Sequence, residues 1–214
     1  MNNATKLFSG LVLTASLIAC GGNPQKETKE TSDQAEKAPK KEEVMESKEF
    51  NIIPNESKVM WSGSVIGVYT HEGTVEITEG NLELAGDKIT GGQFTADVSS
   101  MQATDENYNP EEGKSKEKLI EHLSSDDFFA VNEFPSASFT IKSHDVENNS
   151  ITGDLTIRGV THEEVVEDVK VNLEERTASG KLTIDRKAYD VAFSHPAKDV
   201  VIKDDVNLEV MLKM

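Results

Sequence analysis

Apolar residues recur at every second position through most of the chain after residue 50. In the segment 59–65, Val59, Trp61 and Val65 share one parity, while the other parity is mostly small and polar. This alternation is typical of β-strands with one face against a core and one face in solvent. The same pattern returns in the segments 70–79, 94–98, 137–141, 151–157, 165–173, 182–184 and 206–212. No strand–helix–strand rhythm accompanies it, which excludes a Rossmann-like parallel sheet and predicts an antiparallel all-β domain.

The number of alternating segments predicts eight or nine antiparallel strands. A sheet of that many strands either splits into a sandwich or closes into a barrel. We predict the barrel, because eight strands enclose an interior that can hold one small ligand. Gly91 and Gly92 stand where the apolar parity switches from Ile89 to Phe94, which predicts a β-bulge at that point.

One segment departs from the period of two. Residues 114–123 place Leu119, Ile120 and Leu123 on one helical face, with Ser115 as a suitable N-cap. Residues 124–129 (SSDDFF) predict a second short turn, after which Pro135 returns the chain to extended backbone. The sequence therefore predicts a short helical insertion near residues 114–129, between the fourth and fifth strands.

The chain begins with the pattern of an export signal. Lys6 precedes the apolar run Leu7–Ala19. This run is shorter than the about 20 residues that span a bilayer but suits the apolar region of a signal peptide. Cys20 follows directly, and the segment 17–20 (LIAC) resembles a bacterial lipobox, which implies cleavage before Cys20 and acylation of this residue. The alternative is an ordinary signal peptide followed by an incidental cysteine.

Residues 20–49 predict a lipidated cysteine and a disordered, charged tether. The segment has no aromatic residue and few apolar ones, so it cannot bury enough surface to offset the entropy of ordering. A marginal helix over residues 36–49 is the alternative. The predicted organisation is thus a lipoprotein signal peptide (1–19), the tether (20–49) and one folded domain (50–214).

The charge of the chain limits its partners. It has 22 Lys and Arg against 39 Asp and Glu, a formal net charge of −17. This excess argues against nucleic acid, which proteins bind by neutralising phosphates, and against adsorption to anionic lipid. We expect membrane contact through Cys20 alone. Gly21 and Gly22 offer no acidic cue for inner-membrane retention, so we predict an exported lipoprotein of the bacterial cell envelope, on the periplasmic or surface side of the outer membrane.

Two central motifs resemble those of a known family. The segment 121–135 (EHLSSDDFFAVNEFP) contains the pattern H-L-x-S-x-D-F-F-x-V-x-x-x-P, and the segment 151–161 (ITGDLTIRGVT) contains I-x-G-x-L-T-x-x-G-x-T. Both resemble, in order, the core motifs of the YceI-like family, the bacterial polyisoprenoid-binding proteins. Trp61 with His71 and Gly73 is similar to the family's early W/F and H-x-G strands.

Arg186 stands where the YceI-like family carries an arginine late in the chain. Two features depart from the family. Tyr189 is followed by Asp190 where the family usually has glycine, and the loop 104–113 is long and acidic.

The resemblance implies a lipocalin-like barrel whose apolar interior takes an extended isoprenoid lipid or a quinone-like ligand. We predict that the ligand contacts Trp61, His71, Phe94, His122, Phe128, Phe129, Phe139, Leu155 and Arg186. His71 and His122 are expected to reach a head group. Arg158 and Arg186 either face a pyrophosphate or quinone oxygen or pair with surface acids.

Catalytic motifs are absent from the sequence. His162 and Glu163 resemble the start of H-E-x-x-H, but Val166 replaces the second histidine of that zinc motif. We therefore predict a lipid-binding protein that is not an enzyme and needs no cofactor or metal. Two alternatives remain: an interaction or scaffold domain with a filled core, and a metal-assisted hydrolase that uses His71, His122 and Glu72.

The lipobox makes the first testable prediction. Cys20→Ser removes the thiol that would be acylated, so lipoprotein processing should stop and the protein should no longer incorporate lipid. Metabolic labelling with an alkynyl fatty acid measures this directly, with the unsubstituted chain as the positive control. Undiminished labelling of the Cys20→Ser variant would show that Cys20 carries no lipid.

Overall fold

The computed structural model of the protein describes residues 45–109, 111, 114–195, 197 and 201–214. The chain divides into two units, Met1–Glu42 and Glu43–Met214. The first unit lies outside the described residues, and with it the predicted signal peptide, Cys20 and most of the predicted tether. The first strand begins at Lys48, two residues before the predicted start of the domain at residue 50.

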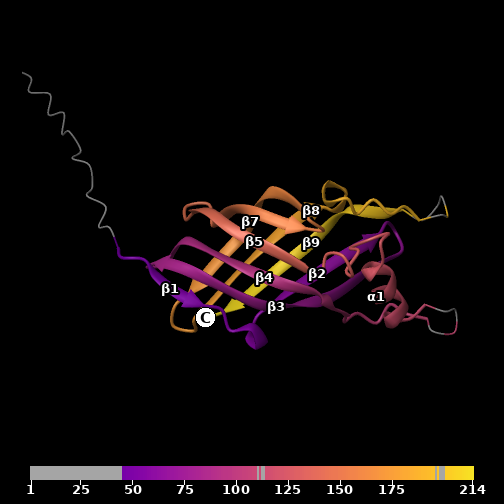
Figure 1. The fold of residues 1–214 in the computed structure, drawn as a ribbon, viewed down its shortest axis with the longest axis horizontal. Coiled ribbons are helices and arrows are strands. Elements are labelled where there is room, and N and C mark those ends of the chain that lie inside the picture. Colours follow the sequence, from indigo (N-terminus) through magenta and orange to yellow (C-terminus); the bar gives the residue numbers. More distant parts are fainter. Residues whose placement is uncertain (1–44, 110, 112–113, 196, 198–200) are drawn as a thin grey trace, which may run out of the picture. The chain divides into compact units, whose positions relative to one another are not determined.

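Nine strands and one α-helix make up the described part of the second unit (Figure 1). The strands are β1 (Lys48–Asn51), β2 (Lys58–Val65), β3 (Tyr69–Ala85), β4 (Lys88–Ala103), β5 (Ser136–Asp145), β6 (Ser150–Ile157), β7 (Val160–Asn172), β8 (Thr177–Asp185) and β9 (Ile202–Lys213). The helix α1 (Lys116–Ser124) lies between β4 and β5. Two short 3₁₀ turns are η1 (Pro54–Glu56) and η3 (Arg186–Tyr189).

The strands form one antiparallel sheet that closes on itself. Their order is β1–β3–β2–β9–β8–β7–β6–β5–β4, and β3 also pairs with β4. This closing pair joins the two longest strands, of 17 and 16 residues. Strands β2 to β9 thereby form an eight-stranded barrel, and β1 is added beside the far end of β3. The predicted all-β barrel of eight to nine strands, with its helical insertion after the fourth, is confirmed.

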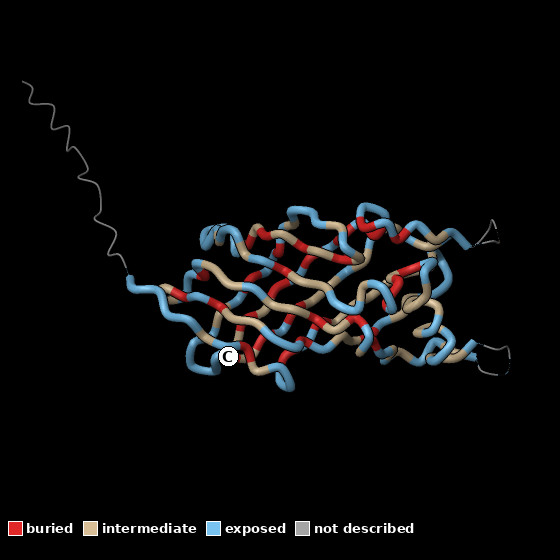
Figure 2. Tube along the Cα trace, in the orientation of Figure 1, coloured by how far each residue is buried: buried red, intermediate tan, exposed pale blue. Residues whose placement is uncertain are grey.

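The predicted alternation matches the burial of most strands. The segment 165–173 in β7 is an exception: Val165 and Leu173 are exposed while Val166 is buried, and the pairing with β8 shifts between Glu167 and Lys170. In β6, Ile151, Gly153, Leu155 and Ile157 are buried while the residues between them are half-buried. Figure 2 shows this alternation of buried and less buried positions along the barrel. Because the strands turn apolar positions inward, one apolar cluster runs through the interior.

The bulge predicted at Gly91 and Gly92 is confirmed. Glu83 pairs with Gly91 and Leu84 pairs with Ile89, so Thr90 is the extra residue on β4. A bulge of this kind bends the strand and increases its twist, which helps a long strand to wrap around a barrel.

Helix α1 lies at one end of the barrel, at the right in Figure 1. Ser115 is its N-cap, as predicted, and accepts a hydrogen bond from the backbone N–H of Lys118 at 3.4 Å. Ile120 and Leu123 pack beside a small buried cluster of Val98, Met101 and Val131. Among the described residues, no helix has the length and apolar character needed to cross a membrane.

Asp190 occupies a backbone conformation that suits glycine. It ends η3 with φ 59° and ψ 19°, in the left-handed region, and its N–H bonds back to the carbonyls of Arg186 and Lys187. Glycine adopts this region without the steric cost that a Cβ imposes. The departure from the glycine that is usual at this position therefore has a local cost in free energy.

Asp190→Gly should raise the free energy of unfolding by about 1 kcal/mol, because it removes that steric cost. For a domain of this size the melting temperature should rise by about 2–4 °C. Asp185→Gly is the matched control: its φ is −83° and its side chain accepts the N–H of Lys187 at 2.9 Å, so the same substitution should lower stability there. A melting temperature that falls equally in both variants would contradict this prediction.

Candidate functional site

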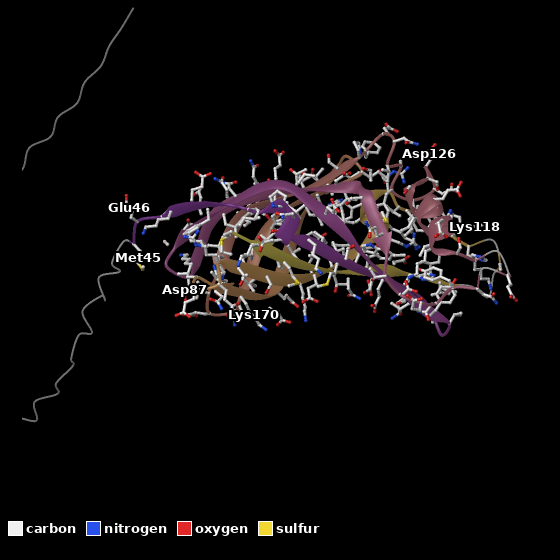
Figure 3. The ribbon with its side chains drawn as sticks, turned by 90° about the horizontal axis from the view of Figure 1, so that it is seen from below. Met45, Glu46, Asp87, Lys118, Asp126 and Lys170 are labelled. Carbon is white, nitrogen blue, oxygen red and sulfur yellow. The ribbon has the colours of Figure 1, made fainter. Side chains whose placement is uncertain are left out.

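A cavity of about 290 Å³ lies in the half of the barrel nearer α1. This volume is close to the lower end of the range for small-molecule sites. Its wall is almost entirely apolar and is supplied by the inward residues of the strands, by α1 and by the turn after it. The charged side chains labelled in Figure 3, among them Lys118, Asp126 and Lys170, lie on the exposed outer side instead.

The structure places all nine residues predicted to contact a ligand around this one cavity. They are Trp61, His71, Phe94, His122, Phe128, Phe129, Phe139, Leu155 and Arg186. They come from β2, β3, β4, β5, β6, α1, η3 and the turn after the helix. Their contact with a ligand stays a prediction.

Small residues opposite each other create the open space. Ala96 of β4 pairs directly with Ala137 of β5, and both line the cavity. Each adds only a methyl group to the interior. In the other half of the barrel the inward positions carry larger side chains such as Leu82, Leu84 and Ile89, and these are almost completely buried. The interior is therefore packed at one end and hollow at the other.

Two glycines of the sequence motifs make room for aromatic rings. A Cβ on Gly73 would lie 2.4 Å from Cζ2 of Trp61 and still closer to the carbonyl oxygen of Gln102. A Cβ on Gly153 would lie 2.4 Å from Cζ of Phe139. Real Cβ atoms do not approach other atoms so closely, so each ring rests where only glycine leaves space. The motif glycines thus shape the cavity wall through its aromatic residues.

His71 is held in place by a carboxylate that the sequence did not reveal. Its Nδ1 lies 3.2 Å from Oδ1 of Asp105, whose Oδ2 accepts the hydroxyl of Tyr108 at 2.8 Å. The backbone N–H groups of Glu72 and Asn107 also donate to this carboxylate. The imidazole stacks on the ring of Tyr108 with centroids 5.1 Å apart. The ring of His71 is therefore fixed in the cavity wall, with Nδ1 directed to Asp105.

The same contacts keep Asp105 ionised. Burial by itself raises the pKa of this carboxyl, but the hydrogen bonds from Glu72, Asn107, Tyr108 and His71 outweigh it and lower the pKa from 3.8 to about 2. Burial and the Asp105 carboxylate in turn raise the pKa of the Tyr108 hydroxyl. Asp105 and Tyr108 lie in the acidic loop that was noted only as a departure from the family, and no periodic pattern in that loop indicates their role.

His122 lies among aromatic rings on the helix side of the cavity. It packs edge-on against Phe128 and Phe193, with ring centroids 4.9 and 4.6 Å away. Phe193 was not predicted as a site residue, because it stands in a segment without a strand pattern. Its ring and that of Phe128 are 5.1 Å apart, so the three rings form one cluster.

Arg158 joins two loops at this end of the barrel. Its guanidinium donates to the backbone carbonyls of Phe128 at 2.6 Å, Asp190 at 2.8 Å and Asp126 at 3.0 Å. The guanidinium of Arg158 thus binds backbone carbonyl groups, and these hydrogen bonds are not to a surface acid. The residue positions the aromatic turn that lines the cavity.

Arg186 is also engaged by the protein itself. It is only 4% exposed, and it donates to the carbonyls of Lys203 at 3.1 Å and Val191 at 2.6 Å. A third donor reaches Oδ1 of Asp204 at 3.0 Å, which satisfies the predicted pairing with a surface acid. Arg186 therefore lines the cavity while its hydrogen bonds fix the start of β9.

The histidines do not gather into a metal site in the described part of the chain. No three His, Cys, Asp or Glu side chains among those residues form a group that could hold a metal ion. His71 and His122 line the same cavity, whereas Glu72 is exposed.

The network around Asp105 makes stability depend on pH. The folded pKa of about 2 lies below the ordinary 3.8, so the ionised carboxylate stabilises the fold above about pH 4, and this contribution is lost as the pH falls toward 2. It amounts to about 2 kcal/mol. Asp105→Asn should lower the free energy of unfolding at pH 7 and reduce its fall between pH 5 and pH 2, as measured by urea unfolding. Asp87→Asn, at an exposed position, serves as the control; identical pH profiles in wild type and Asp105→Asn would contradict the prediction.

Comparison with known proteins supports the resemblance noted in the sequence. UPF0312 protein SA2479 of Staphylococcus aureus (strain N315) is 32% identical over 124 residues, which cover 53% of this chain and 71% of that protein. BcnA of Burkholderia cenocepacia shares the fold, with a TM-score of 0.57 and 23% identity over 75% of this chain and 98% of that one. A polyisoprenoid binding domain from Saccharophagus degradans aligns with a TM-score of 0.48 and 12% identity, over 76% and 95% of the two chains. The model of the YceI-like domain matches residues 50–214, so this protein belongs to the YceI-like family.

Proposed function

We propose that this protein binds an isoprenoid or similar long-chain lipid, including quinone-like lipids, inside the barrel. The apolar cavity beside α1 is the observation that carries the proposal. A hydrocarbon chain needs a dry, elongated space with few polar groups, and the wall around Trp61, Phe94 and Leu155 supplies one. The YceI-like family is a family of binding domains, which supports a lipid-binding role without catalysis.

The polar groups of the wall are gathered near one end of the cavity. Ser64, His71, His195 and Lys203 lie at or near the strand ends on the side of α1. The deeper part of the wall, which includes Val59 and Leu155, is apolar. This gradient favours a ligand whose tail points into the barrel and whose head group stays by the polar end.

The energy of burial is sufficient for useful affinity. Hiding about 400 Å² of apolar surface at about 25 cal/mol per Å² contributes on the order of 10 kcal/mol before association costs. Micromolar dissociation constants are then within reach. The alternative of an interaction domain with a filled core requires a packed interior, and the cavity argues against it.

The proposal includes the location predicted from the sequence. An acylated Cys20 would hold the barrel at a membrane of the bacterial cell envelope, where isoprenoid lipids occur as membrane components. The acidic surface of the chain agrees with attachment through the lipid anchor, since it disfavours adsorption to anionic head groups.

Filling the cavity should abolish binding without unfolding the barrel. Ala137→Phe places a ring in the open space, so the affinity for a prenyl lipid should fall at least tenfold while the fold remains. Thr140→Phe is the matched control, because Thr140 lies on the exposed side of the same strand and the added ring stays outside.

Native mass spectrometry of the purified protein, with thermal shift in the presence of farnesol, provides the measurement. Circular dichroism of each variant checks that the barrel is folded. A folded wild-type protein that carries no lipid and shows no thermal shift with any prenyl compound would overturn the proposed function. Equal binding by the Ala137→Phe variant would place the ligand outside the cavity.

A further inference from the structure

The barrel contains a second, smaller cavity beyond the first. Its volume is about 40 Å³, and it is lined by residues of the packed half such as Leu82, Ile89 and Leu212. Four residues line both cavities: Phe94, Phe139, Val166 and Val210. These side chains therefore form a partition between the two spaces.

The two phenylalanines of the partition face each other across neighbouring strands. Phe94 of β4 pairs directly with Phe139 of β5, and their ring centroids lie 5.7 Å apart at an angle of 34°. This is the distance and tilt of a favourable aromatic pair. Phe139 is only 4% exposed, so its ring is enclosed by the core as well as by its partner.

A glycine lies behind each side chain of the pair. Gly153 leaves the space in which the Phe139 ring rests. Gly80 pairs with Phe94, and a Cβ there would lie 2.7 Å from the Cβ of Phe94. The ring of Phe139 cannot move toward β6, nor the Cβ of Phe94 toward β3, without backbone movement, so the partition is a fixed part of the packed interior.

The depth of the larger cavity follows from the strands. Ser64 lies near the polar end and Val59 near the partition residue Val210, with which it pairs. Five residue-to-residue steps separate these positions and span about 17 Å along β2, at about 3.3 Å per step. Because strands of a barrel tilt by about 35–45° from its axis, a chain that enters from the polar end meets the phenylalanine pair at an axial depth of about 13 Å.

We infer that the Phe94–Phe139 partition sets the longest apolar chain that this protein accommodates. The inference rests on the proposed function and adds to it a specificity for the length of the lipid chain. Each methylene buried inside the cavity raises the affinity about fourfold, whereas carbon atoms beyond the partition have no cavity to enter. Affinity should thus rise with chain length up to a limit and then stop rising.

The test uses all-trans prenyl alcohols that grow by one isoprene unit at a time from geraniol, titrated into the purified full chain. Phe139→Ala joins the two cavities, so in this variant the affinity should continue to rise up to a longer prenyl alcohol than in the wild type. The first alcohol beyond the wild-type limit should bind at least tenfold more tightly to the variant, since two further buried carbons suffice for that gain. Phe139→Leu removes less of the core and replaces the alanine variant if circular dichroism shows that the latter is unfolded.

Leu84→Ala is the matched control. Leu84 is 2% exposed and lines neither cavity, so its truncation destabilises the core to a similar degree without opening the partition. In the Leu84→Ala variant the affinity should stop rising at the same chain length as in the wild type. A wild type that binds none of the alcohols overturns the proposed function and this inference together. A wild type whose affinity rises without limit, or a folded Phe139 variant with an unchanged limit, overturns the inference alone.

Discussion

Backbone pairing along both edges of β3 holds the barrel closed. One edge of β3 pairs with β2 and β1, and the other pairs with β4 over most of its length. Without the β3–β4 ladder the sheet would be open. Its apolar face would then be exposed to solvent or would pack against another chain. Closure turns that face into an interior and fixes the angle at which each inward side chain points. The cavity, the partition and the aromatic wall all depend on it.

Alternation in the sequence was sufficient to predict the strands but not the space between them. A period of two identifies the residues that point inward, and in β6 and β8 these residues are buried as expected. Whether inward residues fill the interior depends on their sizes across the barrel, and this requires knowing which positions face each other. Ala96 and Ala137 lie 41 positions apart in the chain and become opposite neighbours only through the register of β4 and β5.

The site residues that were not predicted lie in loops, where the sequence shows no alternation of apolar and polar positions. Asp105 and Tyr108 follow β4 in an irregular loop, and Phe193 follows η3 in another. The arginines show the same limit in a different form, because a sequence does not reveal whether a guanidinium donates to a phosphate, a carboxylate or a carbonyl. Only the fold reveals that Arg158 donates to three carbonyls of two loops. Its contribution is to hold together segments that the strands leave unconnected.

Strand β1 has a consequence for how the protein behaves among other molecules. In the part of the chain that the structure describes, it is paired along one edge only, and thus forms the open margin of an otherwise closed sheet. This margin is four residues long, and Lys48 and Glu49 are exposed on it. Short length and charge are the features by which natural sheets discourage the addition of foreign strands. An unfolded chain that meets this margin therefore finds little template for aggregation.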